Sequence, residues 1–100
     1  MFKPIYVFDK TNCNWNENNG ANLLFILARC EYFNRRHNIN PNMRLTELLL
    51  DLGFDRADIP AAYWELGWNK GTTIEPELIE VSDGWHIKFN CDTVYSVTIN

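Results

Sequence analysis

The sequence lacks the motifs by which most enzymes and cofactor-binding proteins are recognised. It has no glycine-rich phosphate loop, no GxGxxG pattern and no closely spaced pair of cysteines or histidines. We therefore expect no catalytic residue, no cofactor and no metal site. A small enzyme with an unrecognised site is kept as an alternative.

Long apolar runs and a secretory leader are also missing. The longest unbroken apolar run covers residues 23–28, whereas a helical membrane span needs about 20 residues. The first ten residues, MFKPIYVFDK, have no continuous apolar segment followed by a small-residue cleavage site. We expect no membrane association and a cytoplasmic location.

Cysteines are few, and their arrangement favours reduced thiols. Cys13, Cys30 and Cys91 cannot all pair within one chain, and Cys30 falls inside a helical apolar pattern. His37 and His86 would add further metal-ligand types, but no spacing brings these residues together. The pattern predicts a reducing compartment and separate thiols.

Positive charge is scarce overall and concentrated in one segment. The formal net charge is -4, which argues against general attraction to nucleic acid or anionic membranes. Residues 29–44 nevertheless hold four arginines and one glutamate, while residues 47–92 hold ten acids and three bases. The chain is thus expected to have a basic end and an acidic flank.

Three helices are indicated by apolar periodicity and by residues typical of helix ends. The first is expected over 21–36, capped by Asn18 or Asn19 and covered on more than one side. The second carries one stripe of leucines and is capped by Asn42, and the third begins at Asp58. The stripe consists of Leu45, Leu48, Leu49 and Leu52. Gly53 and Gly67 each precede an aromatic residue, which predicts left-handed helix ends.

Strands are expected at the two ends of the sequence. Residues 2–8 are rich in β-branched and aromatic types, and apolar and polar side chains alternate over residues 79–81 and 85–89. We expect a three-residue 82–84 loop that pairs Val81 with Trp85 and Ile79 with Ile87, with Gly84 in a left-handed bulge. A turn at 90–92 would then place Tyr95, Val97 and Ile99 on the same apolar face. The strand that contains them would be the third strand of a C-terminal meander.

Together these elements predict one α+β domain over residues 1–100, in the order β-α-α-α-β-β-β. An antiparallel sheet with a C-terminal three-stranded meander would pack on the helices. The first strand could join the sheet beside the last strand or in the middle. The element order is also that of a winged helix, but the third helix would carry no basic residue towards DNA.

The segment TNCNWNENNGAN, residues 11–22, holds six asparagines and Trp15. Helix capping accounts for its end but not for its first half. If Trp15 folds back on the helices the segment is a connector, and if it is exposed it is a contact residue.

A second candidate is a stripe on the first helix. Phe25, Arg29, Tyr32 and Arg36 recur at helical spacing and could bind an acidic partner or stack on bases. Alternatively, the two arginines pair with carboxylates of neighbouring helices while the rings fill the core.

These features favour a non-catalytic, protein-binding role for the chain. We expect a small intracellular accessory, adaptor or inhibitor domain, of a composition that would suit a phage or mobile element. The expected partner-binding residues are Trp15, Arg29, Tyr32, Arg35, Arg36 and Trp68. The alternative is a nucleic-acid-binding domain that uses the basic region from Arg29 to Arg44.

Overall fold

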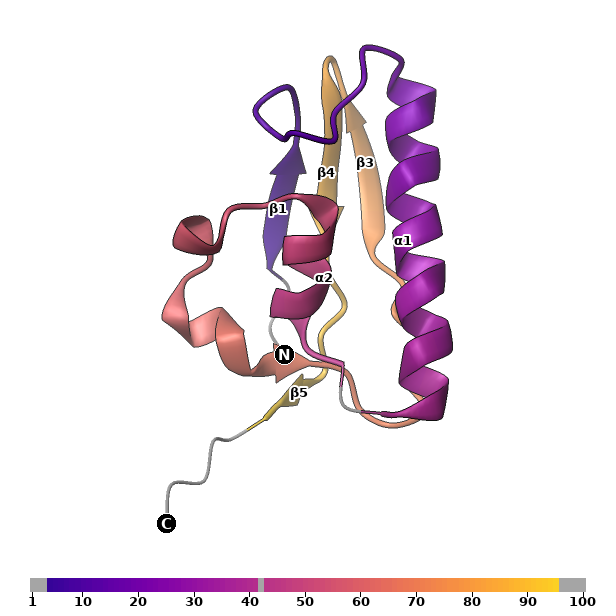
Figure 1. The fold of residues 1–100 in the computed structure, drawn as a ribbon, viewed down its shortest axis with the longest axis vertical. Helices are drawn as coiled ribbons and strands as arrows, with labels where there is room; N and C mark the ends of the chain where they lie inside the picture. Colours follow the sequence, from indigo (N-terminus) through magenta and orange to yellow (C-terminus); the bar gives the residue numbers. More distant parts are fainter. Residues whose placement is uncertain (1–3, 42, 96–100) are drawn as a thin grey trace.

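Figure 1 shows two helices lying against a small antiparallel sheet. The structure, a computed structural model, describes residues 4–41 and 43–95. The elements are β1 (Ile5–Phe8), α1 (Asn19–Ile39), α2 (Leu45–Leu52), the 3-10 helices η1 (Arg56–Asp58) and η2 (Ala61–Glu65), β2 (Leu66–Gly67), β3 (Glu77–Val81), β4 (Gly84–Lys88) and β5 (Thr93–Val94). The predicted α+β class is confirmed.

The main sheet has the strand order β1-β4-β3, and both pairings are antiparallel. Strand β1 lies at an edge of this sheet beside β4, which is neither of the two positions expected from the sequence. The last described strand, β5, pairs instead with β2 in a separate two-stranded ribbon. Tyr95 follows β5, while Val97 and Ile99 lie outside the described residues.

The predicted register of the β3–β4 hairpin is wrong by one residue. Val81 pairs with Gly84 and Ile79 with His86, so the connection has two residues, Ser82 and Asp83. A one-residue shift exchanges the faces of a strand. Leu78 therefore lies opposite Ile87 on the core side, and Ile79 is 50% exposed.

Gly84 explains this register through the approach of β1. Gly84 does not have a positive φ, so the left-handed bulge is not formed. A Cβ on Gly84 would lie 1.9 Å from the carbonyl oxygen of Phe8. Glycine is thus needed here because the backbone of β1 closes directly onto β4.

Helix α1 begins where its cap predicts and extends beyond the expected end. The Asn18 side chain accepts a hydrogen bond from the Ala21 amide at 3.1 Å, as expected of an N-cap. One face is buried, through Asn22, Ile26, Cys30, Phe33 and His37. The expectation of burial on several sides is wrong, because Leu24 is 69% exposed and Leu27 46%.

Helix α2 confirms the leucine stripe. Leu45, Leu48, Leu49 and Leu52 are all fully buried, and Gly53 ends the helix with a φ of 106°. The Phe54 amide then donates to Leu49 O at 3.0 Å, which is the hydrogen bond of a left-handed helix end. The N-cap position is Arg44 rather than Asn42, which lies outside the described residues.

The predicted third helix is not an α-helix. Asp58 ends η1, whose cap is Asp55, and η2 starts after Pro60. Gly67 is not left-handed but lies in β2, where a Cβ would be 2.5 Å from Met43 O. The chain becomes extended at Leu66 because this conformation inserts Leu66 and Trp68 into the core.

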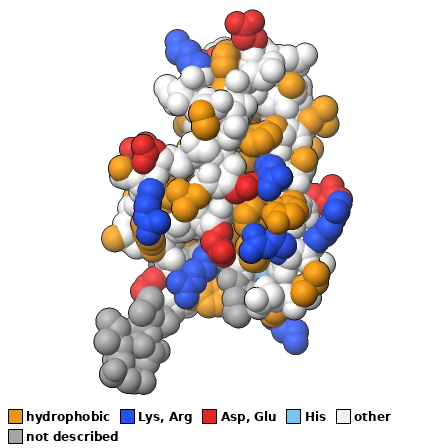
Figure 2. Space-filling model, in the orientation of Figure 1, with side chains coloured by type: hydrophobic (Ala, Val, Ile, Leu, Met, Phe, Trp, Pro, Cys, Tyr) orange, Lys and Arg blue, Asp and Glu red, His pale blue; other side chains and the backbone are white. Residues whose placement is uncertain are grey.

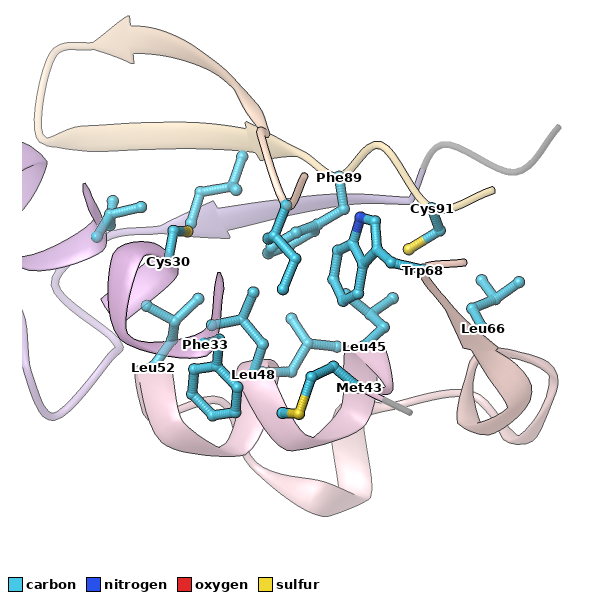
Figure 3. Close-up of a cluster of buried hydrophobic side chains, with 14 of the residues drawn as sticks. Cys30, Phe33, Met43, Leu45, Leu48, Leu52, Leu66, Trp68, Phe89 and Cys91 are labelled. Carbon is cyan, nitrogen blue, oxygen red and sulfur yellow. The ribbon is translucent and has the colours of Figure 1, made fainter. Parts of the chain in front are cut away.

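The core lies between the sheet and the helices, as Figure 3 shows. Trp68, Phe89 and the four leucines of the α2 stripe are fully buried there, and each buried large side chain contributes about 1.5–3 kcal/mol. Cys30 and Cys91 are also buried, and all three cysteines are free thiols. The core thus fixes α1 and α2 side by side, which positions the surface described next.

Candidate protein-interaction surface

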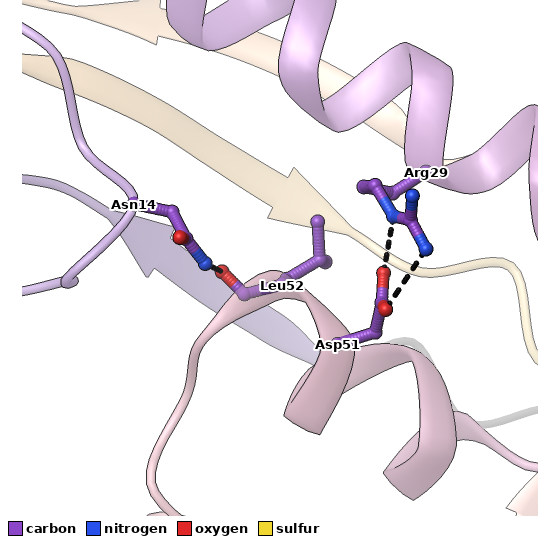
Figure 4. Close-up of polar contacts among 4 residues, drawn as sticks. All are labelled: Asn14, Arg29, Asp51 and Leu52. Carbon is purple, nitrogen blue, oxygen red and sulfur yellow. Dashed lines mark hydrogen bonds and ion pairs between the residues drawn. The ribbon is translucent and has the colours of Figure 1, made fainter.

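An ion pair joins α1 to α2 at the centre of this surface (Figure 4). Arg29 donates from Nε and from an Nη to the two carboxylate oxygens of Asp51, at 2.5 and 2.9 Å. This hydrogen bonding raises the pKa of Arg29. Both side chains are about a third exposed, so the pair contributes at most about 1 kcal/mol. Arg29 thus pairs with a carboxylate of a neighbouring helix, as one of the two alternatives for this residue predicted.

The Tyr32 ring lies between two guanidinium groups. Arg29 Cζ is 4.7 Å and Arg36 Cζ 5.7 Å from its centroid. Arg36 also lies 5.3 Å from the centroid of Phe33, which meets Tyr32 edge to face. The spacings of three and four residues along α1 produce this stack.

Arg36 differs from its neighbours because, within the described part of the chain, it has no carboxylate partner. Arg29 is held by Asp51, and Arg35 pairs with Glu31 at 2.6 Å. Among residues 4–41 and 43–95, the Arg36 guanidinium interacts only with the Tyr32 and Phe33 rings, so none of these residues accepts a hydrogen bond from it.

Apolar groups surround this charge. Tyr32 is 43% exposed and Ile39 is 86% exposed, and together with Arg36 they follow one side of α1. Figure 2 shows Lys and Arg side chains interspersed with hydrophobic ones over the α1–α2 side of the molecule. We call the group Arg29, Tyr32, Arg35, Arg36 and Ile39 the arginine–tyrosine face.

Two further arginines lie over aromatic rings outside α1. Arg44 Cζ is 5.5 Å from the Tyr95 centroid and Arg56 Cζ is 4.2 Å from the Trp64 centroid. Such a contact contributes about 0.5–1 kcal/mol at an exposed site. Stacking on rings is therefore the usual environment of arginine in this protein.

The two tryptophans expected at a binding surface lie elsewhere. Trp68 is fully buried, and its Nε1 donates to Asn90 Oδ1 at 3.0 Å, so the expectation of a contact role at the surface is corrected. Trp15 is half-buried and donates from Nε1 to Asp83 O at 2.7 Å. It ties its loop to the β3–β4 turn, which is the role of a connector.

The asparagine-rich segment is a hydrogen-bonded junction between several elements. Asn14 donates to Leu52 O at the end of α2, at 3.0 Å (Figure 4). Asn19 donates to Gly84 O at 3.1 Å, and Asn22 donates to Asn16 O at 2.8 Å. These amides replace the backbone pairing that an irregular segment lacks.

A polar cavity of about 290 Å³ adjoins this junction. Its lining contains the Cys13 thiol and the carboxylates of Asp55 and Asp58. Asp55 accepts from the Ala57 amide at 2.9 Å as a cap. Across the described residues, no three His, Cys, Asp or Glu side chains are grouped so that they could hold a metal ion.

Burial keeps two of the thiols protonated. It raises the pKa of Cys30 to about 11, and burial followed by the charge of Asp92 raises that of Cys91 to about 12. A thiol is nucleophilic as its thiolate, so neither suits nucleophilic catalysis.

None of the helices described here is long and apolar enough to cross a membrane.

Sequence reasoning found Arg29, Tyr32 and Arg36 through their helical spacing, and it missed Ile39. The missing signal was the true end of α1: the helix was expected to stop near residue 36, whereas it continues to Ile39.

In comparisons with protein-family models, curated proteins and solved structures, nothing matches this chain.

Proposed function

We propose that this chain is a non-catalytic protein-binding domain whose arginine–tyrosine face binds an acidic segment of a partner. The observation that carries the proposal is Arg36, an exposed guanidinium placed over two aromatic rings without a carboxylate of its own among the described residues. The fold supplies this group with two ring contacts but, among the described residues, with no carboxylate. The group is arranged for an anion supplied from outside.

The chemistry of the face favours a carboxylate flanked by apolar side chains. A guanidinium presents two parallel N–H groups to a carboxylate, and a stacked one loses less freedom on binding. Exposed Tyr32 and Ile39 offer apolar contact on the same side of α1, and tyrosine and arginine are frequent interface anchors. An acidic segment with neighbouring apolar residues fits both.

The proposed setting is a cytoplasmic accessory, adaptor or inhibitor protein. The free thiols and the small, acidic, asparagine-rich composition support this setting. The same composition would suit a phage or mobile-element protein that acts on host machinery. A catalytic role gains no support from Cys30 and Cys91, whose thiols are buried.

A second candidate is nucleic-acid binding by the region from Arg29 to Arg44, because a guanidinium on a tyrosine also stacks on bases. The analogy with a winged helix is weakened, since the segment that would read DNA is the 3-10 helix η2 and not an α-helix. Binding to nucleic acid would weaken steeply as salt rises.

The test compares capture of proteins from the cognate cell lysate by four forms of the domain, after nuclease treatment. We expect one stoichiometric protein with the native chain, clear loss with Arg36→Ala, and partial loss with Arg36→Lys, which keeps the charge without the planar stack. Lys10→Ala, which removes one exposed positive charge from the loop after β1, is the matched control. Equal capture by Arg36→Ala, or capture that nuclease abolishes, would overturn the proposal.

A further inference from the structure

The outer edge of β3 carries backbone groups that are free for pairing. Val81 and Gly84 flank a two-residue turn, and such residues exchange both hydrogen bonds. Because bonded and non-bonded pairs alternate in an antiparallel ladder, the backbones of Ile79 and Glu77 also face β4. The N–H and C=O groups of Leu78 and Glu80 therefore point away from the sheet. No described strand pairs with them.

A cavity of about 300 Å³ lies directly before this edge, between α1 and residues 73–76. Two hydrogen bonds between the Asn34 side chain and the backbone of Ile74, at 2.7 and 2.9 Å, hold that segment against the helix. Leu27 and Pro76 contribute apolar lining, and Leu27 is 46% exposed.

The edge is acidic. Glu31 and Glu75 line the cavity, and Glu77 and Glu80 lie on β3. Glu31 and Glu77 have Arg35 and Lys88 as partners, at 2.6 and 3.9 Å. The Glu80 carboxylate accepts a hydrogen bond from Asn19 Nδ2 at 3.0 Å, and within the described residues neither Glu75 nor Glu80 has a cationic partner. Two copies of this chain paired through β3 would bring these carboxylates together, which disfavours self-association.

We propose that the β3 edge and its adjoining cavity bind an extended, basic segment of a partner protein as an added strand. Backbone hydrogen bonds to Leu78 and Glu80 would supply the pairing, and basic side chains would meet Glu75 and Glu80. An apolar side chain would fill the cavity beside Leu27. Strand addition to an exposed edge is a general mode of peptide recognition, and edges are usually protected by charge.

The probe is a blocked heptapeptide, Lys-Thr-Lys-Val-Val-Thr-Lys, which carries lysine and valine on the same face of a strand; it is added to the whole protein and followed by amide NMR. We expect shifts, and slower hydrogen exchange, at the amides of Leu78 and Glu80. A peptide whose central valine is replaced by proline lacks one donor and should bind about tenfold more weakly. A peptide with glutamate in place of each lysine should not bind.

Variants of the protein separate strand addition from general charge attraction. Glu80→Pro removes one outward N–H and the charge, and it should weaken binding about tenfold more than Glu80→Gln, which removes the charge alone; the proline peptide tests the same bond without altering the fold. Glu75→Gln should weaken binding, whereas Glu17→Gln, in the loop before α1, should not.

Equal binding of the proline peptide, shifts elsewhere, or no binding would overturn the proposal. Protection of Leu78 and Glu80 in the protein alone, with a dimer by sedimentation, would identify a second copy as the occupant and would also overturn it. Arg36→Ala should leave peptide binding unchanged, so failure here is distinguishable from failure of the arginine–tyrosine face.

Discussion

Replacement of Asn22 by alanine should destabilise the protein although it removes only one polar side chain. Asn22 is 1% exposed. Its Oδ1 accepts from Asn16 N and its Nδ2 donates to Asn16 O, both at 2.8 Å. Loss of these two bonds costs about 1–1.5 kcal/mol each, and alanine regains about 0.5 kcal/mol of helix propensity. We expect a net loss of about 2 kcal/mol.

The measurement is urea unfolding followed by tryptophan fluorescence, where this loss lowers the midpoint by about 1–2 M. Asn38→Ala is the matched control, because Asn38 is an exposed residue of the same helix and its replacement should change stability by less than about 0.5 kcal/mol. If both variants have the same midpoint, the amide junction does not stabilise the fold and the reasoning is refuted.

Asn22→Asp makes the test sharper because it keeps the shape and removes the donor. The carboxylate would face Asn16 O and Asn19 Oδ1, the two oxygens to which Asn22 Nδ2 now donates. Burial and these acceptors favour the protonated acid, so the folded pKa of the new group lies above its unfolded value. The destabilisation is therefore present at neutral pH and shrinks as the pH falls through that folded pKa.

Three further outcomes follow from burial and close approach. Gly84→Ala would place a Cβ 1.9 Å from a β1 carbonyl oxygen, so we expect a loss of about 2 kcal/mol or more in thermal unfolding; a neutral result would contradict the observed strand contact. Burial, followed by the charges of Tyr63 and Asp58, raises the pKa of Tyr6 to about 12. The contribution of the protonated Tyr6 to the stability of the fold is therefore complete below about pH 10 and is lost as the pH rises towards 12. Tyr6→Phe should remove this loss, which alkaline unfolding would measure. A thiol reagent at pH 8 should modify Cys13 alone in the native protein and Cys30 and Cys91 after unfolding; rapid native modification of all three would contradict the core.

The sequence predicted those parts of the fold that depend on nearby residues. The Asn18 cap, the leucine stripe of α2 and the left-handed Gly53 each follow from contacts within one helix and its ends. Periodicity and capping act over about one turn of chain. Such features can be recognised without knowing what packs against them.

Errors arose where a distant segment determines the conformation. Gly84 was interpreted as a turn residue. It must be glycine, however, because Phe8 on another strand leaves no room for a side chain. Gly67 was interpreted as a helix end, but Met43 and Tyr95 approach it. Glycine marks close approach as well as positive φ, and the sequence alone does not distinguish these causes.

The candidate site shows the same division. The position of Arg29, Tyr32 and Arg36 on one side of a helix was predicted from their spacing, whereas the contacts of the two guanidinium groups with the Tyr32 ring were not. Trp68 was wrongly assigned to the surface because its burial depends on the extended segment β2 that precedes it. In the core, Trp68 donates a hydrogen bond to Asn90. A tryptophan is typical of both interfaces and cores, so only the fold decides between them.

The charge asymmetry of the sequence becomes an asymmetry across α1. Arg29 faces α2 through Asp51, and Arg36 shares the Tyr32 ring with it, so the arginine–tyrosine face lies on that side. Asn34 instead faces Ile74, beside the acidic β3 edge. One helix thus separates a surface suited to acidic segments from one suited to basic segments. The two surfaces have opposite charge and are joined by the Arg35–Glu31 ion pair; we propose that they bind two partners, or two segments of one partner, as an adaptor would.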